Sequence, residues 1–568
     1  MNELSCKCNL KANKPLILNY MNLLFFLALI VFCVSCSDED SDPALHYNIE
    51  TSVDTLVFDP EGGEMSFTLN TNAKWQIHTN ANWLTYTPTA DSKNASEQKI
   101  TVSVPEFVDY TTRTAIISIK SGDIDNDVVK RKFILITQVG PEKPERGPGI
   151  WSKQDLVEFG EAISGNQDYS QWSDENGIVN LMDNIDFGAD KIPCMGGMST
   201  NNNLMEGSDA AFNGTFNGNG HTIKGQLDGG DKMIVALFTR IGPKAIIENL
   251  IVDITGISSF NQSNGHLATI VGFSLSADDG YIKNCIAKGS LTQTGTNSTR
   301  VGGIVAYGRT KIVDCQSNVD IQAVSNRVGG IAGAGGGSYT FENCINNGNI
   351  SVTCDVTQTG GIVGQLNGQT LLGCINNGKI SVTAIGAVAV GGIAGQAQGT
   401  SNIGNDGDGY GCENNGEITL VATDLSSSDN ATVGGIAGNV TTATAVIKNS
   451  LNNALVKSNC NKELVSAGGI AGKVTAATSI TLSTNSINGT VIAAQNAGGI
   501  VGKATAALSI SACTNLGNID VLTNATLPTA GRYIGGIIGQ KGSATYTDCN
   551  YGGFVMSIAG TSANAEGH

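Results

Sequence analysis

Residues 343–352 read NCINNGNISV, and residues 373–382 read GCINNGKISV. A second motif, Gly-Gly-Ile, recurs between segments of this kind. Its copies are spaced by 27 to 43 residues, with a mean of about 33, and a period of this length is typical of stacked repeats. The copies begin at Gly302, Gly329, Gly360, Gly391, Gly434, Gly468, Gly498 and Gly535.

Each repeat offers three short strands. One lies at Gly-Gly-Ile, one enters the Asn-Cys segment, and one leaves the Asn-Gly turn. Three parallel strands per coil with tight turns form a right-handed parallel β-helix, and we expect about 9–11 coils over residues 150–560. The sequence leaves open which side of the Gly-Gly-Ile strand faces inward, because Val301 and Ile304, on opposite sides of it, are both apolar.

Cysteines mark the same register. One repeat position is held by a cysteine in seven units, and Ser450 and Asn485 fill it in the two others. Side chains in register on parallel strands point the same way and not toward each other, and no Cys-x-x-Cys spacing occurs. We therefore expect a column of free, buried thiols, with disulfides or a metal site as the alternative. The cysteines are Cys285, Cys315, Cys344, Cys374, Cys412, Cys513 and Cys549.

The start of the repeat region carries its own signals. Ser152 to Asp155 resembles a capping box, and Leu156, Phe159 and Ile163 follow at helical spacing, so a short helix is expected to cap the open end of the β-helix. Residues 211–223 then read AFNGTFNGNGHTI. This run resembles the opening of bacterial β-helical surface proteins that carry the GLUG repeat.

Composition excludes several classes of function. The 568 residues contain 33 Lys and Arg against 50 Asp and Glu, a formal charge of −17, without a basic cluster. This excess of acidic residues argues against a positively charged surface that binds nucleic acid. The five histidines are scattered along the chain, so the sequence predicts no metal site, no cofactor and no His-dependent triad.

The N-terminus resembles a secretory signal. Lys7, Lys11 and Lys14 precede an apolar run that ends in Val34-Ser35-Cys36. This ending resembles the lipobox of bacterial lipoproteins, which implies residues 1–35 as the signal peptide and Cys36 as the acylated residue. The acidic stretch within residues 36–46 is similar to the export signal of Bacteroidota surface lipoproteins, and implies an anchor at the outer face of the outer membrane. An uncleaved membrane helix is the alternative.

Residues 47–140 contain six or seven short alternating segments, which predict an antiparallel β-sandwich. Three sequence features of this region resemble the BACON domain of Bacteroidota surface proteins. They are the segment FDPEGGEMSF, the AKW and ANWL pair, and the closing Gln138-Val139-Gly140. That resemblance implies an immunoglobulin-like module, often placed beside carbohydrate-active or carbohydrate-binding domains. Residues 141–149, rich in Pro and charge, are expected to be a linker. The whole chain is predicted to be all-β apart from the capping helix.

Two sets of residues are candidates for carbohydrate binding. In the sandwich, Trp75 alternates with polar neighbours and is expected in the core, whereas Trp83 and Tyr86 lie in a turn-rich stretch where rings could stack on sugars. In the β-helix, a polar row lies five residues beyond the first glycine of each motif. Stacked amides beside lysines there suit sugar hydroxyls or an acidic glycan, and a purely structural amide ladder is the alternative. Its candidate binding residues are Gln365, Gln396, Asn439, Lys473, Lys503 and Gln540.

Charges in the repeats are sparse, and no repeat position is acidic in successive coils. The acidic turn at residues 405–410 lacks the further ligands of a calcium loop. We therefore expect a non-catalytic surface lipoprotein that binds glycans or a host or cell-surface partner. A polysaccharide lyase or glycoside hydrolase on a β-helix and a passive stalk are the alternatives.

Overall fold

In the computed structural model the chain forms two compact units, Met1–Arg146 and Gly147–His568. The structure describes residues 47–552 except 80, 92–96, 110, 126–127, 142–145, 198–209, 230–231, 257–259, 261–264, 276–278, 296–298, 406–410, 424–430, 461–464 and 523–531. The predicted signal, Cys36, the acidic tether and most of the turn at 405–410 lie outside the described residues. Among the described residues no helix is long and apolar enough to cross a membrane.

The first unit is a two-sheet β-sandwich, as the alternating segments predicted, and its strand pairs are antiparallel except for the edge pair β2 (Thr55–Phe58) and β9 (Val128–Val139), which is parallel. One sheet has the antiparallel order β1 (Ile49–Thr51), β3 (Gly63–Thr71), β7 (Gln98–Val104) and β5 (Thr85–Thr87). The other has the order β2, β9, β8 (Thr112–Asp123), β4 (Trp75–Thr79) and β6 (Ala90–Asp91). Inward residues of both sheets form one apolar core, and Trp75 is completely buried in it, which confirms the core prediction.

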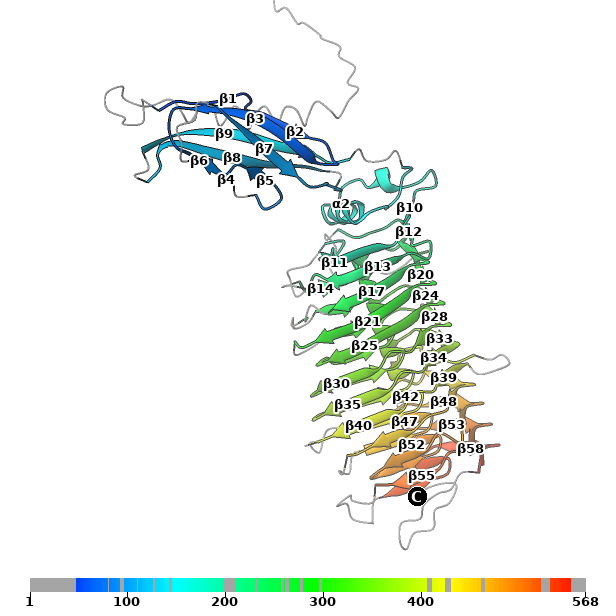
Figure 1. Ribbon diagram of the computed structural model, residues 1–568. Coiled ribbons are helices and arrows are strands. Elements are labelled where there is room, and N and C mark those ends of the chain that lie inside the picture. The colour runs from blue at the N-terminus through cyan, green and yellow to red at the C-terminus, as the bar shows by residue number, and fades with distance from the viewer. Residues whose placement is uncertain are drawn as a thin grey trace, which may run out of the picture. The chain divides into compact units, whose positions relative to one another are not determined.

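The second unit is a parallel β-helix whose strands stack along one axis (Figure 1). Each coil contributes to four sheets, and the coil from residue 345 is representative: β29 (Ile345–Asn346) and β30 (Ile350–Cys354) belong to sheet IV, β31 (Thr357–Gly360) to sheet I, β32 (Val363–Asn367) to sheet II and β33 (Thr370–Leu372) to sheet III. Sheets I and II each have 10 strands, sheet III has 12 and sheet IV has 18. Ten strands in sheets I and II fit the predicted coil number.

The sheets run the length of the unit. Sheet I extends from β14 (Ile234–Val235) to β56 (Tyr533–Gly535), and sheet II from β15 (Phe238–Ile241) to β57 (Ile538–Gln540). Sheet III extends from β10 (Ile178–Asn180) to β58 (Thr545–Thr547), and sheet IV from β11 (Ile185–Ile192) to β59 (Asn550–Tyr551). All strand pairs along them are parallel, for example Gln365 with Gln396 in sheet II.

Gly-Gly-Ile is a corner and not a strand, so the expectation of three strands per coil was wrong. The glycine pair ends the sheet I strand, and the sheet II strand begins after the isoleucine. Because the chain turns between them, Val301 and Ile304 both point inward, and both are completely buried. This turn answers the question of orientation that the sequence left open.

Most repeats have three glycines held by close contacts, as the repeat at Gly391 shows, and in the repeat at Gly302 the third position is Ala306. A Cβ on Gly391 would lie 2.0 Å from the Ala394 carbonyl oxygen, within the turn itself. A Cβ on Gly392 would lie 2.1 Å from the Gly435 carbonyl oxygen of the next coil. A Cβ on Gly395 would lie 2.5 Å from a backbone nitrogen of sheet I. The glycine pair therefore permits an approach of backbones that any side chain would prevent, whereas the third position accepts an alanine in one coil, Ala306.

A ladder of buried asparagines lies directly beneath the corner. Each side-chain amide donates to the side-chain oxygen of the next asparagine, as Asn376 does to Asn414 and Asn414 to Asn452, both at 2.9 Å. The same amide also donates to a backbone carbonyl two residues on, which for Asn414 is that of Gly416. A Cβ on Gly392 would lie 2.3 Å from Cγ of Asn414, so ladder and corner fit only together. The members are Asn346, Asn376, Asn414, Asn452, Asn485 and Asn515.

Asn485 thus belongs to the asparagine ladder, and its assignment to the cysteine position was wrong. Asn485 pairs in register with Asn452, which places Ser483 in line with Ser450. Both serine hydroxyls donate to the carbonyl two residues earlier, at 3.0 Å, the bond that cysteine thiols make elsewhere in the column. Serine therefore replaces cysteine as a small buried donor.

The thiol column is otherwise confirmed. Its seven cysteines are free, and all are buried except Cys549, which is partly exposed. Burial raises the pKa of the Cys513 thiol to about 12, so this thiol stays neutral at physiological pH. The column is part of the core.

The predicted cap is the helix α2 (Lys153–Ser164), which lies at the end where the coils begin (Figure 1). The Ser152 hydroxyl accepts a hydrogen bond from the Asp155 backbone N–H, closing the predicted N-cap. The buried ring of Phe159 contacts the rings of Phe212 and Phe216 at centroid distances of 6.0 and 5.9 Å. The 3₁₀ helix η1 (Ser170–Trp172) adds Trp172 at 5.7 Å. An aromatic plug therefore closes the first coil.

We predict that Gly392→Ala lowers the free energy of unfolding by about 3 kcal/mol or more, because its Cβ meets backbone on one side and the asparagine ladder on the other. Gly308→Ala is the matched control, since its Cβ would meet nothing nearer than 3.6 Å. Urea denaturation of both variants measures the difference. Equal stability of the two variants would contradict the corner geometry.

Candidate binding surface

The predicted polar row forms one continuous column on sheet II. Gln365 pairs in register with Gln396, Gln396 with Asn439, and the column continues to Gln540. All six side chains are partly exposed, whereas the residues that flank them on the same strands are buried. The strands are β32, β37 (Ala394–Gln398), β42 (Ala437–Val440), β47 (Ala471–Val474), β52 (Val501–Ala504) and β57. The column therefore faces outward.

A second column, which the sequence analysis missed, runs beside it on sheet I. It lies two residues before each glycine pair, and Arg300, Arg327 and Gln358 succeed one another in it. The Arg327 Nε donates to Oε1 of Gln365 at 2.7 Å, and the Gln358 amide donates to Gln396. Polar residues do recur two positions before the glycine pair in the sequence. That they lie beside the sheet II column could not be inferred without knowing that the chain turns a corner between the two sheets.

We call the two columns together the polar strip. On sheet I it comprises His266, Arg300, Arg327, Gln358, Thr432, Ser466 and Asn496, and Ala389 lies between Gln358 and Thr432 in this column. On sheet II it comprises Phe273, Tyr307, Gln365, Gln396, Asn439, Lys473, Lys503 and Gln540, and Ala334 lies between Tyr307 and Gln365. None of these described positions is an Asp or a Glu.

Stacked rings and a guanidinium form the N-terminal end of the strip. The His266 ring, on β18 (His266–Ala268), lies 5.8 Å from that of Phe273 on β19 (Val271–Ser274), with the planes nearly parallel. The Tyr307 ring, on β23 (Val305–Gly308), stacks on Phe273 at 5.4 Å. Arg300 Cζ lies 4.8 Å from the Tyr307 ring centre, a cation–π contact. Tyr307 remains partly exposed.

Burial and mutual repulsion act on the charged groups of the strip. Burial, followed by the charge of Arg327, lowers the pKa of Arg300 to about 10. Burial, followed by the charge of Lys503, likewise lowers the pKa of Lys473. For His266 burial is again the main cause, with Arg300 next, and the pKa falls to about 3. Arg300 remains charged at neutral pH, while His266 is neutral.

Several buried polar atoms of the strip have no hydrogen-bond partner in the described part of the chain. They are Nε of Arg300, Oε1 of Gln358, and the side-chain oxygens of Asn439 and Asn496. A buried polar atom left without a partner costs about 1–3 kcal/mol, and such atoms in native proteins are satisfied by water, ions or ligands. The strip therefore contains one donor and three acceptors that bond to no described residue of the chain.

The two sandwich candidates are engaged in contacts within their own unit. Arg113 Cζ lies 4.2 Å above the Trp83 ring and 4.3 Å from the Phe107 ring, so one face of Trp83 is covered. The same guanidinium donates to Oε1 of Gln138 at 2.7 Å. The Tyr86 hydroxyl donates to the Ile77 carbonyl oxygen at 3.1 Å, and its ring packs on the core. Both side chains are partly exposed, but these contacts favour structural roles.

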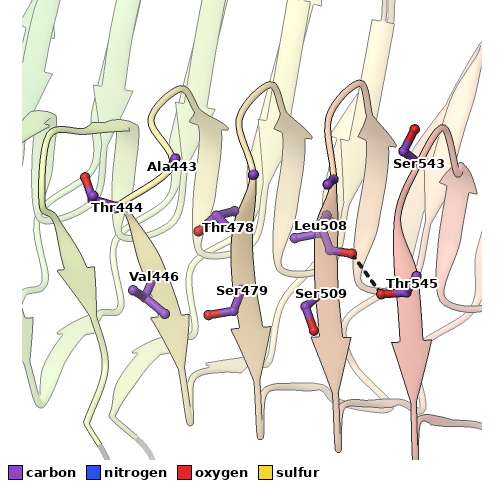
Figure 2. A pocket seen from close by; sticks show the side chains of 11 residues that line it. Ala443, Thr444, Val446, Thr478, Ser479, Leu508, Ser509, Ser543 and Thr545 are labelled. Atoms are coloured by element: carbon purple, nitrogen blue, oxygen red, sulfur yellow. Dashed lines mark hydrogen bonds between the residues drawn. The ribbon is translucent and has the colours of Figure 1, made fainter.

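A hollow of about 380 Å³ lies on sheet III near the C-terminal coils (Figure 2). It is formed by β43 (Val446–Lys448), β48 (Thr478–Thr481), β53 (Leu508–Ser511), β58 and the turns before them. Its lining is rich in hydroxyls, and the Thr545 hydroxyl donates to the Leu508 carbonyl oxygen at 3.5 Å. It holds no titratable side chain, so it offers contact surface but no acid or base. The hydroxyl residues are Thr444, Thr478, Ser479, Ser509, Ser543 and Thr545.

Within the described ranges, no group of three or more His, Cys, Asp or Glu side chains is placed to hold a metal ion. What the strip can do chemically is bind, because its groups are amides, hydroxyls, guanidinium and ammonium groups and aromatic rings. The neutral His266 is its one side chain with a pKa far below the usual range.

A family model described as "BACON: Putative binding domain, N-terminal" matches residues 73–138. These residues run from β4 into β9, so the first unit contains the BACON domain that the sequence resembled. No curated protein matches the chain. The GLUG resemblance of the second unit stays a prediction.

Solved structures match only a minor part of the chain. A Bacteroides ovatus GH5 xyloglucanase in complex with a XXXG heptasaccharide is 18% identical at a TM-score of 0.15, over 21% of this chain and 25% of that one. The PapD-like domain 7 of human CEP192 is 11% identical at 0.16, over 19% and 96%. The periplasmic chaperone SfaE is 11% identical at 0.15, over 19% and 68%. The chain thus covers a quarter of the xyloglucanase, and these scores assign no shared fold.

We predict that His266→Phe, which keeps a stacked ring, changes how stability depends on pH. The pKa of His266 is about 3 in the folded chain and near 6.5 when unfolded. The contribution of a neutral buried His266 is therefore complete above pH 6.5 and is lost as the pH falls toward 3, by about 1.4 kcal/mol per pH unit.

Urea denaturation at pH 7 and pH 4.5 measures the effect. The stability advantage of wild type over His266→Phe is expected to shrink at pH 4.5, with His78→Phe, an exposed histidine of the sandwich, as the control. An advantage that is constant or grows on acidification would contradict a buried neutral His266.

Proposed function

We propose that this chain is a lipid-anchored protein of the bacterial cell surface that binds glycans, or a host or cell-surface partner, without catalysis. The sandwich supports this proposal through its match to a putative binding domain. The β-helix supports it through the partly exposed polar column of sheet II and through adjoining buried polar atoms that have no hydrogen-bond partner among the described residues.

The polar strip is the observation that carries the proposal. A structural amide ladder satisfies nearly all of its own atoms, as the buried asparagines do when each amide bonds to the next; the exception is the side-chain oxygen of Asn346, the first member, which has no partner among the described residues. The strip contains similar amides, yet the oxygens of Gln358 and Asn439 are buried and have no partner among the described residues. Sugar hydroxyls donate and accept hydrogen bonds and suit such a surface. An extended polymer is favoured, because the strip crosses coil after coil.

The anchor proposal rests on Cys36 and the apolar run before it. We predict that the chain expressed in a bacterium incorporates labelled palmitate and that Cys36→Ala abolishes the label. Cys33→Ala, three residues upstream, is the control and keeps it. Surface exposure follows from digestion of intact cells with added protease. Label retained by Cys36→Ala would overturn the anchor.

Glycan binding is tested by affinity electrophoresis of residues 37–568 through gels that contain host and plant polysaccharides. We predict retardation by at least one polysaccharide, and a loss of affinity of about tenfold in Gln365→Ala/Gln396→Ala. The control is Asn377→Ala/Asn415→Ala, two exposed asparagines of sheet IV that bond to each other at 3.0 Å. Migration unaffected by every polysaccharide would favour the stalk. Release of reducing or unsaturated ends would favour an enzyme.

A further inference from the structure

We propose that the polar strip selects acidic polysaccharides, whose carboxylate or sulfate groups bind at two cationic pairs, Arg300 with Arg327 and Lys473 with Lys503. This inference rests on the proposed function and adds the class of ligand. It follows from how the charges of the strip are placed.

The cations of the strip stand beside like charges. Arg300 pairs in register with Arg327, and Lys473 with Lys503. Neighbouring strands lie about 4.8 Å apart, and like charges directly opposite each other on a sheet are destabilising. All four side chains are only partly exposed, so solvent screens this repulsion incompletely. An anion between the members of a pair removes the repulsion.

Several lysines elsewhere on the β-helix have acidic partners on adjacent coils, and two of them show the contact. The ammonium of Lys311 lies 3.4 Å from a Glu342 carboxylate oxygen, and that of Lys379 lies 3.1 Å from one of Glu417. Within the described part of the chain, Arg300, Arg327 and Lys503 form no such ion pair. This contrast arises in a chain of net charge −17, so a shortage of acids does not explain it.

The guanidinium groups are held in place by neutral contacts. Arg300 lies over the Tyr307 ring, and Arg327 bonds through Nε to Gln365 and through Nη1 to Asn326, at 2.7 and 3.4 Å. None of these contacts neutralises a charge. Guanidinium groups fixed in this way match carboxylate and sulfate oxygens, to which they donate strong, charge-assisted hydrogen bonds.

The unpartnered atoms separate a polysaccharide from an acidic polypeptide. Nε of Arg300 requires an acceptor, which an anionic oxygen supplies. The oxygens of Gln358, Asn439 and Asn496 require donors. An acidic sugar polymer brings both, because every unit adds hydroxyl donors to its anionic group. In an acidic polypeptide the ionised side chains supply acceptors only, and its donors are the backbone N–H groups, one per residue against several hydroxyls per sugar unit.

The spacing favours a polymer over a single sugar. From Arg327 to Lys473 the strip crosses four coils, or about 19 Å at the usual strand separation. The intervening positions on sheet II are Gln365, Gln396 and Asn439. A chain with recurring anionic groups therefore reaches both cationic pairs while its hydroxyls meet the amides between them.

The test compares four polymers on residues 37–568 by affinity electrophoresis and titration calorimetry: polygalacturonate for carboxylates, heparin for sulfates, dextran as a neutral glycan and polyglutamate as an acidic polypeptide. The variants are Arg300→Gln/Arg327→Gln and Lys473→Gln/Lys503→Gln. The control is Lys311→Gln/Lys379→Gln, which removes the same charge away from the strip. The lysine pair keeps the test valid if the more deeply buried arginine pair impairs folding.

We expect polygalacturonate or heparin to bind, each strip variant to lose at least about tenfold in affinity, and the control to retain wild-type affinity. Added salt at 0.5 M weakens binding, because it screens partly exposed charges. Retention by dextran as strong as by the acidic glycans, or unchanged affinity in the strip variants, overturns the inference and leaves glycan binding standing. Tighter binding of polyglutamate assigns the strip to an acidic polypeptide. If none of the four polymers retards the protein on the gels but a different neutral glycan does, the selectivity for acidic polysaccharides is overturned and glycan binding still stands.

Discussion

The contact between the corner glycine and the buried asparagine beneath it sets the shape of every coil from Asn346 to Asn515. At Gly392 and Asn414 a single Cβ would come within 2.3 Å of the asparagine side chain. The asparagine in turn bonds to its neighbours in the coils before and after it. Coil shape and coil-to-coil register are therefore fixed by the same residues, which explains why so much glycine occurs in a well-packed core.

The corner also decides what faces solvent. Because the chain bends at the glycine pair, the apolar residues on both sides of it point inward, and the partly exposed polar column of sheet II lies beside Arg300, Arg327 and Gln358 of sheet I, whereas His266, Thr432, Ser466 and Asn496 are buried. The strip is thus a consequence of the fold, and its side chains are free to vary without disturbing the ladder. Rings and arginines gather toward one end, amides in the middle and lysines toward the other.

The sequence predicted the repeat, the sandwich, the capping helix and the thiol column, because period, alternation and spacing are local signals. It missed the four-sided coil, since a glycine pair between apolar residues has the same pattern in a strand and in a corner. The assignment of Asn485 failed because register depends on pairing with Asn452, which spacing alone does not show. The sheet I column of the strip, which includes Arg300 and Arg327, was not predicted from the sequence, because only the fold shows that it lies beside the sheet II column.

A crystal structure of the chain with an acidic oligosaccharide, such as an oligogalacturonate, would locate the ligand on the molecule. We predict that the sugar lies along sheets I and II, with a carboxylate between Arg300 and Arg327 or between Lys473 and Lys503, and with hydroxyls bonded to the oxygens of Gln358 or Asn439. A sugar bound only on the sandwich or in the hydroxyl-lined hollow of sheet III, with the strip empty at saturating ligand, would contradict this prediction.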